Sequence, residues 1–150
     1  MGKIKTNIFS KNISFSSIIE SLPSLRLKMP SLFKRLGGKS AVNAVVDRFY
    51  EYMLNDERVN HFFTKINMEK QRQHQRHFMT FAFGGDVTYD GQDMRSAHQV
   101  LVEKKGLSDV HFDATVENLE NALKDFNVTD DLISEVKNIV EGVRTDVLLK

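Results

Sequence analysis

The sequence contains no cysteine among its 150 residues. This absence excludes disulfide bonds, iron–sulfur clusters, thiolate-ligated haem and covalent haem attachment through a Cys-x-x-Cys-His motif. It also fits a reducing compartment. The chain has no apolar stretch near the roughly 18 residues that a bilayer-spanning helix needs. Its formal net charge of +1 gives no general attraction to nucleic acid. We therefore expect no nucleic-acid partner and no transmembrane segment.

The length and the hydrophobic content of 41% suit one domain with one core, which we place at residues 30–150. Residues 1–29 form an extension of different composition, rich in serine and in basic side chains. Its charged residues are Lys3, Lys5, Lys11, Arg26 and Lys28, with Glu20 as the one acid. Such a composition is typical of an organelle transit peptide, and a disordered tail or a short membrane-surface helix stays an alternative. The expected location is cytoplasmic, or organellar if the extension is a targeting segment.

Apolar residues recur at helical spacing along the rest of the chain, so we predict an all-α fold. Paired glycines at 37–38 and 84–85 end helices, Pro30 suits a first turn, and Ser40, Asn67 and Thr129 are candidate caps. No alternating strand pattern of useful length appears. The helices are expected over residues 31–36, 41–55, 68–83, 93–104 and 109–126, and from 130 through Val147.

The helix expected over residues 68–83 carries polar side chains on its apolar side. At about 100° per residue, Gln71, His74 and Gln75 share one face. Polar groups in a core cost roughly 1–3 kcal/mol each when unpartnered, so a polar or metal-containing ligand is expected there. Tyr50 adds a polar tip from the preceding helix, and His98 supplies a candidate metal ligand from the following one. A nitrogen ligand on one side and hydrogen-bond donors on the other are what a haem iron with a diatomic ligand requires.

Several short motifs occur in a fixed order between residues 31 and 150. They are LFKRLGG at 32–38, FY at 49–50, DERV at 56–59, HFF at 61–63, MEKQRQHQ at 68–75, FAFGG at 81–85, YDG at 89–91, AH at 97–98 and HFDA at 111–114. In this order and spacing they resemble a group 1 truncated haemoglobin, close to the cyanobacterial type. The resemblance implies a two-over-two helical sandwich around haem, in which the short helix before the proximal histidine is reduced to a loop.

The resemblance also implies roles for individual residues. His98 matches the proximal haem ligand, and its other ring nitrogen is expected to donate to a backbone carbonyl. His74 matches the distal histidine that binds iron when no other ligand is present. Tyr50, Gln71 and Gln75 match the distal cluster that hydrogen-bonds iron-bound ligands. Other residues expected to contact the cofactor are Phe63, Lys70, Phe78, Phe81, Met94, Leu101 and Phe112. Lys70 either reaches a haem propionate or is simply solvated.

The histidines mark one departure from the family pattern. Some cyanobacterial relatives link a histidine of the last helix to a haem vinyl group, whereas this chain has no histidine there, so we expect non-covalent haem b. His77 and His74 have a spacing that can bind zinc, but no third ligand is evident and we expect His77 to be solvated. We expect His61 and His111 to be structural. The complete set is His61, His74, His77, His98 and His111.

The expected function is a monomeric haem globin that reversibly binds O₂, NO, CO or similar ligands, with a hexacoordinate bis-histidine resting state. The dense distal cluster predicts slow O₂ release, which suits chemistry on O₂ better than oxygen transport. One hypothesis is NO dioxygenation, or detoxification of reactive nitrogen or oxygen species, with an unidentified reductase as partner. The alternative is a haem-based electron-transfer or sensing protein without turnover, and a helical protein without haem is a third possibility.

Overall fold

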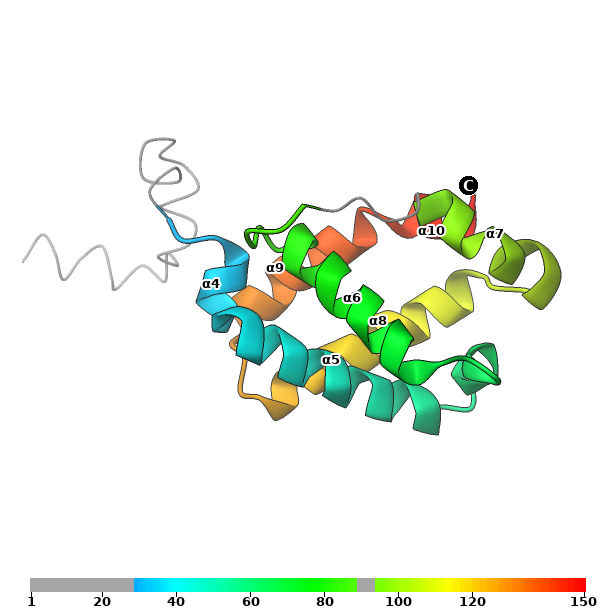
Figure 1. Ribbon diagram of the computed structural model, residues 1–150, viewed down its shortest axis with the longest axis horizontal. Helices are drawn as coiled ribbons and strands as arrows, with labels where there is room; N and C mark the ends of the chain where they lie inside the picture. The colour runs from blue at the N-terminus through cyan, green and yellow to red at the C-terminus, as the bar shows by residue number, and fades with distance from the viewer. Residues whose placement is uncertain (1–28, 89–93) are drawn as a thin grey trace, which may run out of the picture. The chain divides into compact units, whose positions relative to one another are not determined.

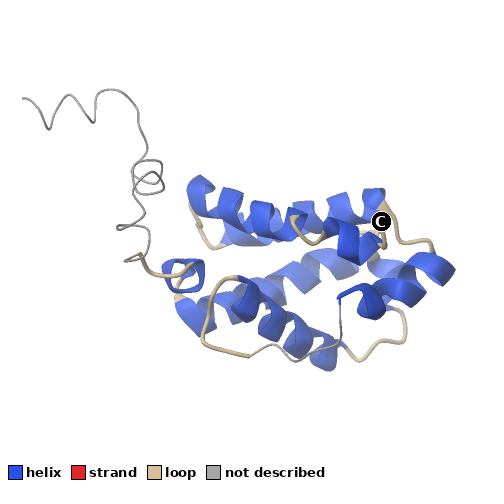
Figure 2. Ribbon diagram, turned by 90° about the horizontal axis from the view of Figure 1, so that it is seen from above, coloured by secondary structure: helices blue, strands red, loops and turns tan. Residues whose placement is uncertain are grey.

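The computed structural model describes residues 29–88 and 94–150. The expectations for the basic extension and for the turn at Tyr89-Asp90-Gly91 lie outside these ranges. Within them, all regular structure is helical, as Figure 2 shows, so the all-α prediction is confirmed. None of the described helices is both long enough and apolar enough to cross a bilayer. The elements are α4 (Leu32–Leu36), α5 (Gly38–Asn55), the 3₁₀ turn η1 (Asn60–Phe63), α6 (Met68–Ala82), α7 (Met94–Lys105), α8 (Asp109–Asp125), α9 (Asp130–Glu141) and α10 (Arg144–Leu148).

The first two helices meet at a sharper corner than expected. Gly37 has a φ of 116°, a left-handed conformation that costs a glycine little, and α5 begins at the very next residue. Ser40 therefore lies inside α5 and does not cap it. Pro30 lies outside α4, because Ser31 is the cap and its hydroxyl accepts from the Lys34 amide at 3.3 Å.

The expected last helix is in fact two helices. α9 ends at Glu141 with Gly142 as its C-cap, and α10 begins at Arg144. Val143 and Val147 continue the apolar spacing, so the periodicity alone runs through the break. By contrast, the predicted cap of α6 is confirmed, since the Asn67 side chain accepts from the Lys70 amide at 3.1 Å.

The core lies between α5 and α8. Each contributes a row of buried side chains, and α5 also packs against α6 while α8 packs against α9. Two helix pairs stacked in this way form a two-over-two sandwich. α7 packs against α10, and Figure 1 shows these two helices side by side at the end of the domain away from α4. The buried residues at the α5–α8 centre are Val42, Val45, Val46, Phe49, Tyr50, Met53, Leu119, Ala122 and Leu123.

Candidate functional site

The structure brings together a tyrosine of α5 and a glutamine of α6. Gln71 Nε2 donates to the Tyr50 hydroxyl oxygen at 3.1 Å. Tyr50 is 2% exposed, and its ring meets the Phe49 and Phe63 rings edge to face at centroid distances of 5.0 and 5.7 Å. Burial raises the pKa of Tyr50 to about 12, although the Gln71 hydrogen bond acts the other way. The phenol therefore keeps its proton at neutral pH and remains a hydrogen-bond donor.

His98 lies apart from this pair, on α7, and is half-buried. Its Nδ1 lies 2.9 Å from the backbone carbonyl oxygen of Met94, one turn earlier. A carbonyl can only accept, so Nδ1 carries the proton and donates, as expected from the sequence. The lone pair of Nε2 is then available to a metal ion, and the ring orientation is set by the helix backbone.

The side of α6 that carries the other expected cofactor contacts is poorly covered by protein. Lys70 and His74 are exposed, Phe78 is half-buried, and the Phe81 ring is 49% exposed although it is large and apolar. α7 has no buried residue at all, even though Met94, His98 and Leu101 are half-buried. Contiguous exposed apolar side chains mark binding surfaces, and Phe81 shares its side of α6 with the half-buried Phe78. A flat apolar ring system with a central metal ion fits such surfaces and the free imidazole nitrogen of His98.

The buried side of α6 is shifted from the one expected. Gln71 and Gln75 are half-buried as predicted, whereas His74, expected inward, is exposed on the side that also carries Phe81. Arg72 and Arg76, expected off the face, are partly buried. Their partner is Asp47 of α5, whose carboxylate lies 2.6 Å from Arg76 Nη2 and 3.9 Å from Arg72 Nε.

Two more expected cofactor contacts have clear protein partners. Phe63 is half-buried and packs on Tyr50. Phe112 is 6% exposed and belongs to a small cluster with Val116 and Leu148, with the Arg144 guanidinium carbon 4.3 Å from its ring centre. The structure therefore explains the burial of Phe112 without any cofactor.

The remaining histidines have structural partners, one of which the sequence did not suggest. His77 is exposed, as expected, and its Nε2 also donates to the Thr88 carbonyl at 2.7 Å. His111 Nδ1 accepts from the Ser108 amide at 3.0 Å and completes a capping box at the start of α8. The usual third-position residue in such a box is Glu or Gln, which is why sequence reasoning missed a histidine there. Across residues 29–88 and 94–150, no three His, Asp or Glu side chains form a group able to hold a metal ion.

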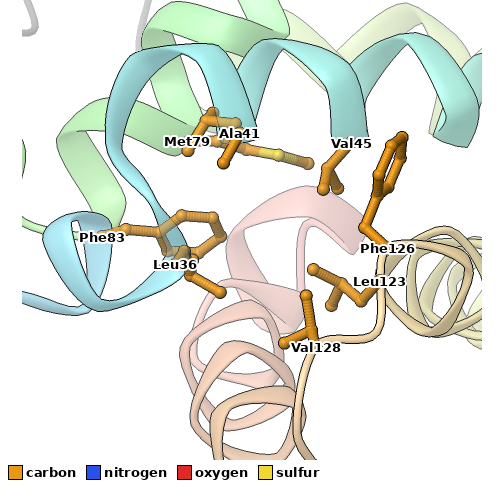
Figure 3. Close-up of a pocket in the computed structure, with 9 residues that line it drawn as sticks. Leu36, Ala41, Val45, Met79, Phe83, Leu123, Phe126 and Val128 are labelled. Atoms are coloured by element: carbon orange, nitrogen blue, oxygen red, sulfur yellow. The ribbon is translucent and has the colours of Figure 1, made fainter.

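An apolar cavity of about 200 Å³ lies elsewhere in the domain, and none of the expected cofactor residues lines it. Figure 3 shows side chains from α5, α6 and the α8–α9 turn pointing into it. Its lining has no ionisable group, so it offers no acid, base or metal ligand. The candidates for chemistry are therefore the Tyr50–Gln71 pair and His98. The lining residues are Leu36, Ala41, Val42, Val45, Met79, Phe83, Leu123, Phe126 and Val128.

Comparison with known proteins agrees with this geometry. The family model described as bacterial-like globin matches residues 31–148. The group 1 truncated hemoglobin GlbN of Synechocystis sp. is 52% identical over 108 residues, which cover 72% of this chain and 87% of that protein.

Solved structures give the same answer for the fold. The 2/2 hemoglobin from Synechococcus sp. PCC 7002, in the cyanomet state and with covalently attached heme, has a TM-score of 0.78 and 53% identity and covers 81% of this chain and 100% of that one. The Fe(III) form of truncated hemoglobin from Tetrahymena pyriformis has a TM-score of 0.73 and 39% identity over 79% of this chain and 98% of that one. Single tyrosine and glutamine variants of the Tetrahymena protein have been solved too. The predicted two-over-two sandwich is confirmed.

Proposed function

The chain belongs to the bacterial-like globin family as a group 1 truncated haemoglobin, and on this premise we propose that it binds haem b through His98 and holds diatomic ligands beside Tyr50. Haem is the general cofactor of the family, and its iron would supply a binding position for O₂, NO or CO. No histidine lies on α9 or α10, which supports non-covalent binding.

His98 would anchor the iron through Nε2. The hydrogen bond from Nδ1 to the Met94 carbonyl supports this role, because it holds the imidazole in one tautomer and one orientation. A donated proton on Nδ1 also makes Nε2 a stronger electron donor, which strengthens the bond to a metal ion.

The strongest support for the ligand site is the protonated, hydrogen-bonded phenol of Tyr50. The phenol oxygen already accepts from Gln71, so its own proton is left to be donated to something else. Burial keeps that proton in place, with a pKa of about 12. A small ligand with partial negative charge on its outer atom is the acceptor such a donor suits. Gln75, half-buried one turn after Gln71, would tune the pair.

The Tetrahymena relative supports the same trio. The tyrosine and the two glutamines replaced in its solved variants are separated by 21 and 4 positions. Tyr50 and Gln71 are also 21 positions apart, and Gln75 follows after 4 more. This identical spacing in a related fold supports a corresponding role for Tyr50, Gln71 and Gln75.

His74 would supply a second imidazole to the iron in the resting state. Its exposed ring lies three residues after Gln71, on the side of α6 that also carries Phe78 and Phe81. An incoming ligand would have to displace it, so apparent affinity falls with the fraction of protein in which it is bound. The ferric protein should show a low-spin bis-histidine spectrum, and His74→Leu should convert it to a high-spin one. A spectrum unchanged by the substitution would remove His74 from this role.

The reaction we propose converts NO, O₂ and one electron to nitrate, with the electron supplied by an external reductase through the haem. The buried Tyr50–Gln71 pair supports it, because a phenol proton donated there to O₂ would slow its release. NO consumption by the reduced, oxygenated protein should exceed that of free haem. Rapid reversible redox cycling without NO consumption would instead favour the electron-transfer alternative.

For residues 1–29 we propose a targeting role, which rests on their basic, serine-rich composition. Fused to a fluorescent protein, this segment should direct it to an organelle. Diffuse cytoplasmic fluorescence would oppose the proposal.

The experiment that tests the ligand site compares two tyrosines of α5. Tyr50→Phe removes the buried donor, and O₂ dissociation should become about 10-fold faster, as expected for a lost hydrogen bond near 1.4 kcal/mol. Tyr52→Phe is the matched control, because the Tyr52 hydroxyl donates to Asp125, at 2.7 Å, and not to the Gln71 region. Stopped-flow O₂ dissociation rates would decide. Equal rates in Tyr50→Phe and the parent protein would contradict the proposed role.

A further inference from the structure

We propose that Arg95 and Asp146 position the proximal histidine by tying the first turn of α7 to α10. This inference rests on the proposed function of His98 as the iron ligand. It adds a positioning pair that lies outside the ligand pocket itself.

The packing of α7 makes such a support necessary. α7 buries none of its side chains, and α10 is the described element against which it packs most extensively (Figure 1). A helix without buried apolar residues has little to hold its position before the cofactor binds. The five-residue helix α10 is therefore the main protein support of α7.

Arg95 makes polar contacts between α7 and the C-terminal segment that contains α10. Its Nη1 donates to Asp146 Oδ1 and to the Lys150 backbone carbonyl, both at 3.3 Å. Arg95 is one residue after Met94, whose carbonyl accepts from the His98 ring, and three residues before His98 itself. The same turn thus holds the orienting carbonyl and the anchoring guanidinium, so a shift of that turn must also shift the imidazole.

α10 is in turn fixed to α8. Arg144 donates to Asp109 at 3.1 Å and to Asp113 at 2.5 Å, and Lys150 pairs with Asp109. Leu148 is 5% exposed and packs with Phe112 and Val116 of α8. The support for the proximal histidine therefore runs from α8 through α10 to the first turn of α7.

The test uses the haem-loaded full chain with Arg95→Gln. Because Arg95 and Asp146 are about half exposed, at 44% and 52%, the energetic effect should be modest. We expect haem loss to be about two- to five-fold faster, as for an exposed ion pair. The Fe–His stretching band of the ferrous protein after CO photolysis should shift or broaden. Arg95→Lys, which keeps the charge, should restore most of both.

Lys124→Gln is the matched control, because it removes an exposed ion pair with Glu120 within α8 that touches neither α7 nor α10. It should leave the Fe–His band and the haem-loss rate unchanged. If Arg95→Gln behaves like this control while the parent protein shows a normal Fe–His band, the positioning role is wrong. If the parent protein shows no Fe–His band, it is the proposed function that fails.

Discussion

The two halves of this domain differ sharply in how much they bury. α5 and α8 contribute six and seven buried residues, whereas α6 contributes one and α7 none. α6 and α7 are nevertheless regular helices of 15 and 12 residues with apolar side chains on one side. Isolated helices of that length are marginal in water, so packing must stabilise them.

The α5–α8 half therefore packs a core of its own, whereas the α6–α7 half buries little of its apolar surface within the protein. Large apolar side chains are exposed in both halves, Leu54 and Val110 in the first and Phe81 and Val100 in the second, but only the second half leaves its helices almost without buried residues. The polar groups of α6 and α7 include the imidazole of His98 and the amide of Gln71, which donates to Tyr50 of α5, beside ion pairs of Arg76 with Asp47 and of Arg95 with Asp146. A bound haem would cover the apolar groups and engage the polar ones.

The largest contrast should come from truncating one residue in each half. Leu119→Ala in α8, at a side chain 4% exposed, should lower the free energy of unfolding by about 2–5 kcal/mol with or without haem. Phe81→Ala in α6 should change the haem-free protein by only about 0.5 kcal/mol, as for surface positions, yet speed haem loss. Denaturant titrations of both forms measure the first effect, and haem transfer to a scavenger globin measures the second. A large loss of stability in haem-free Phe81→Ala would contradict the claim that the α6–α7 half packs little without haem.

A smaller effect, the pH dependence of the free energy of unfolding, should also distinguish the two halves. Asp56 ends α5 and accepts from Arg58 and, at 2.9 Å, from Asn118 of α8, and these bonds hold the pKa of its carboxyl well below the usual range. Its stabilisation is therefore complete above about pH 4, the unfolded value, and is lost as pH falls further. Asp56→Asn should be less stable than the parent at pH 7, with the gap closing in acid. Haem should not alter that gap, since the contact belongs to the α5–α8 half, and the exposed Glu57→Gln is the control.

Much of the packed half could be predicted from sequence, because local periodicity and caps decide it. The apolar spacing predicts α5 and α8 there, and in the other half it predicts α6, whose cap Asn67 also follows from the sequence. The break between α9 and α10 was missed because Val143 and Val147 keep the spacing, while the restart depends on contacts that α10 makes with α7 and α8.

The candidate site was predicted in part. The Met94 contact of His98 followed from the needs of a metal-bound imidazole, and it is present. The partial burial of Arg72 and Arg76 does not follow from the apolar spacing of α6, because their partner Asp47 lies on another helix. The capping role of His111 was hidden because a histidine there mimics a glutamate.

The measurement that tests the central claim most directly is a titration of the purified chain with haemin, followed by absorbance, for the parent protein and for His98→Ala. The parent should bind one haem per chain and develop a sharp Soret band with a histidine-ligated spectrum, and His98→Ala should lose or scramble that spectrum. A parent protein that stays colourless after haemin is added, or a His98→Ala variant with the same proximal signature, would contradict the account.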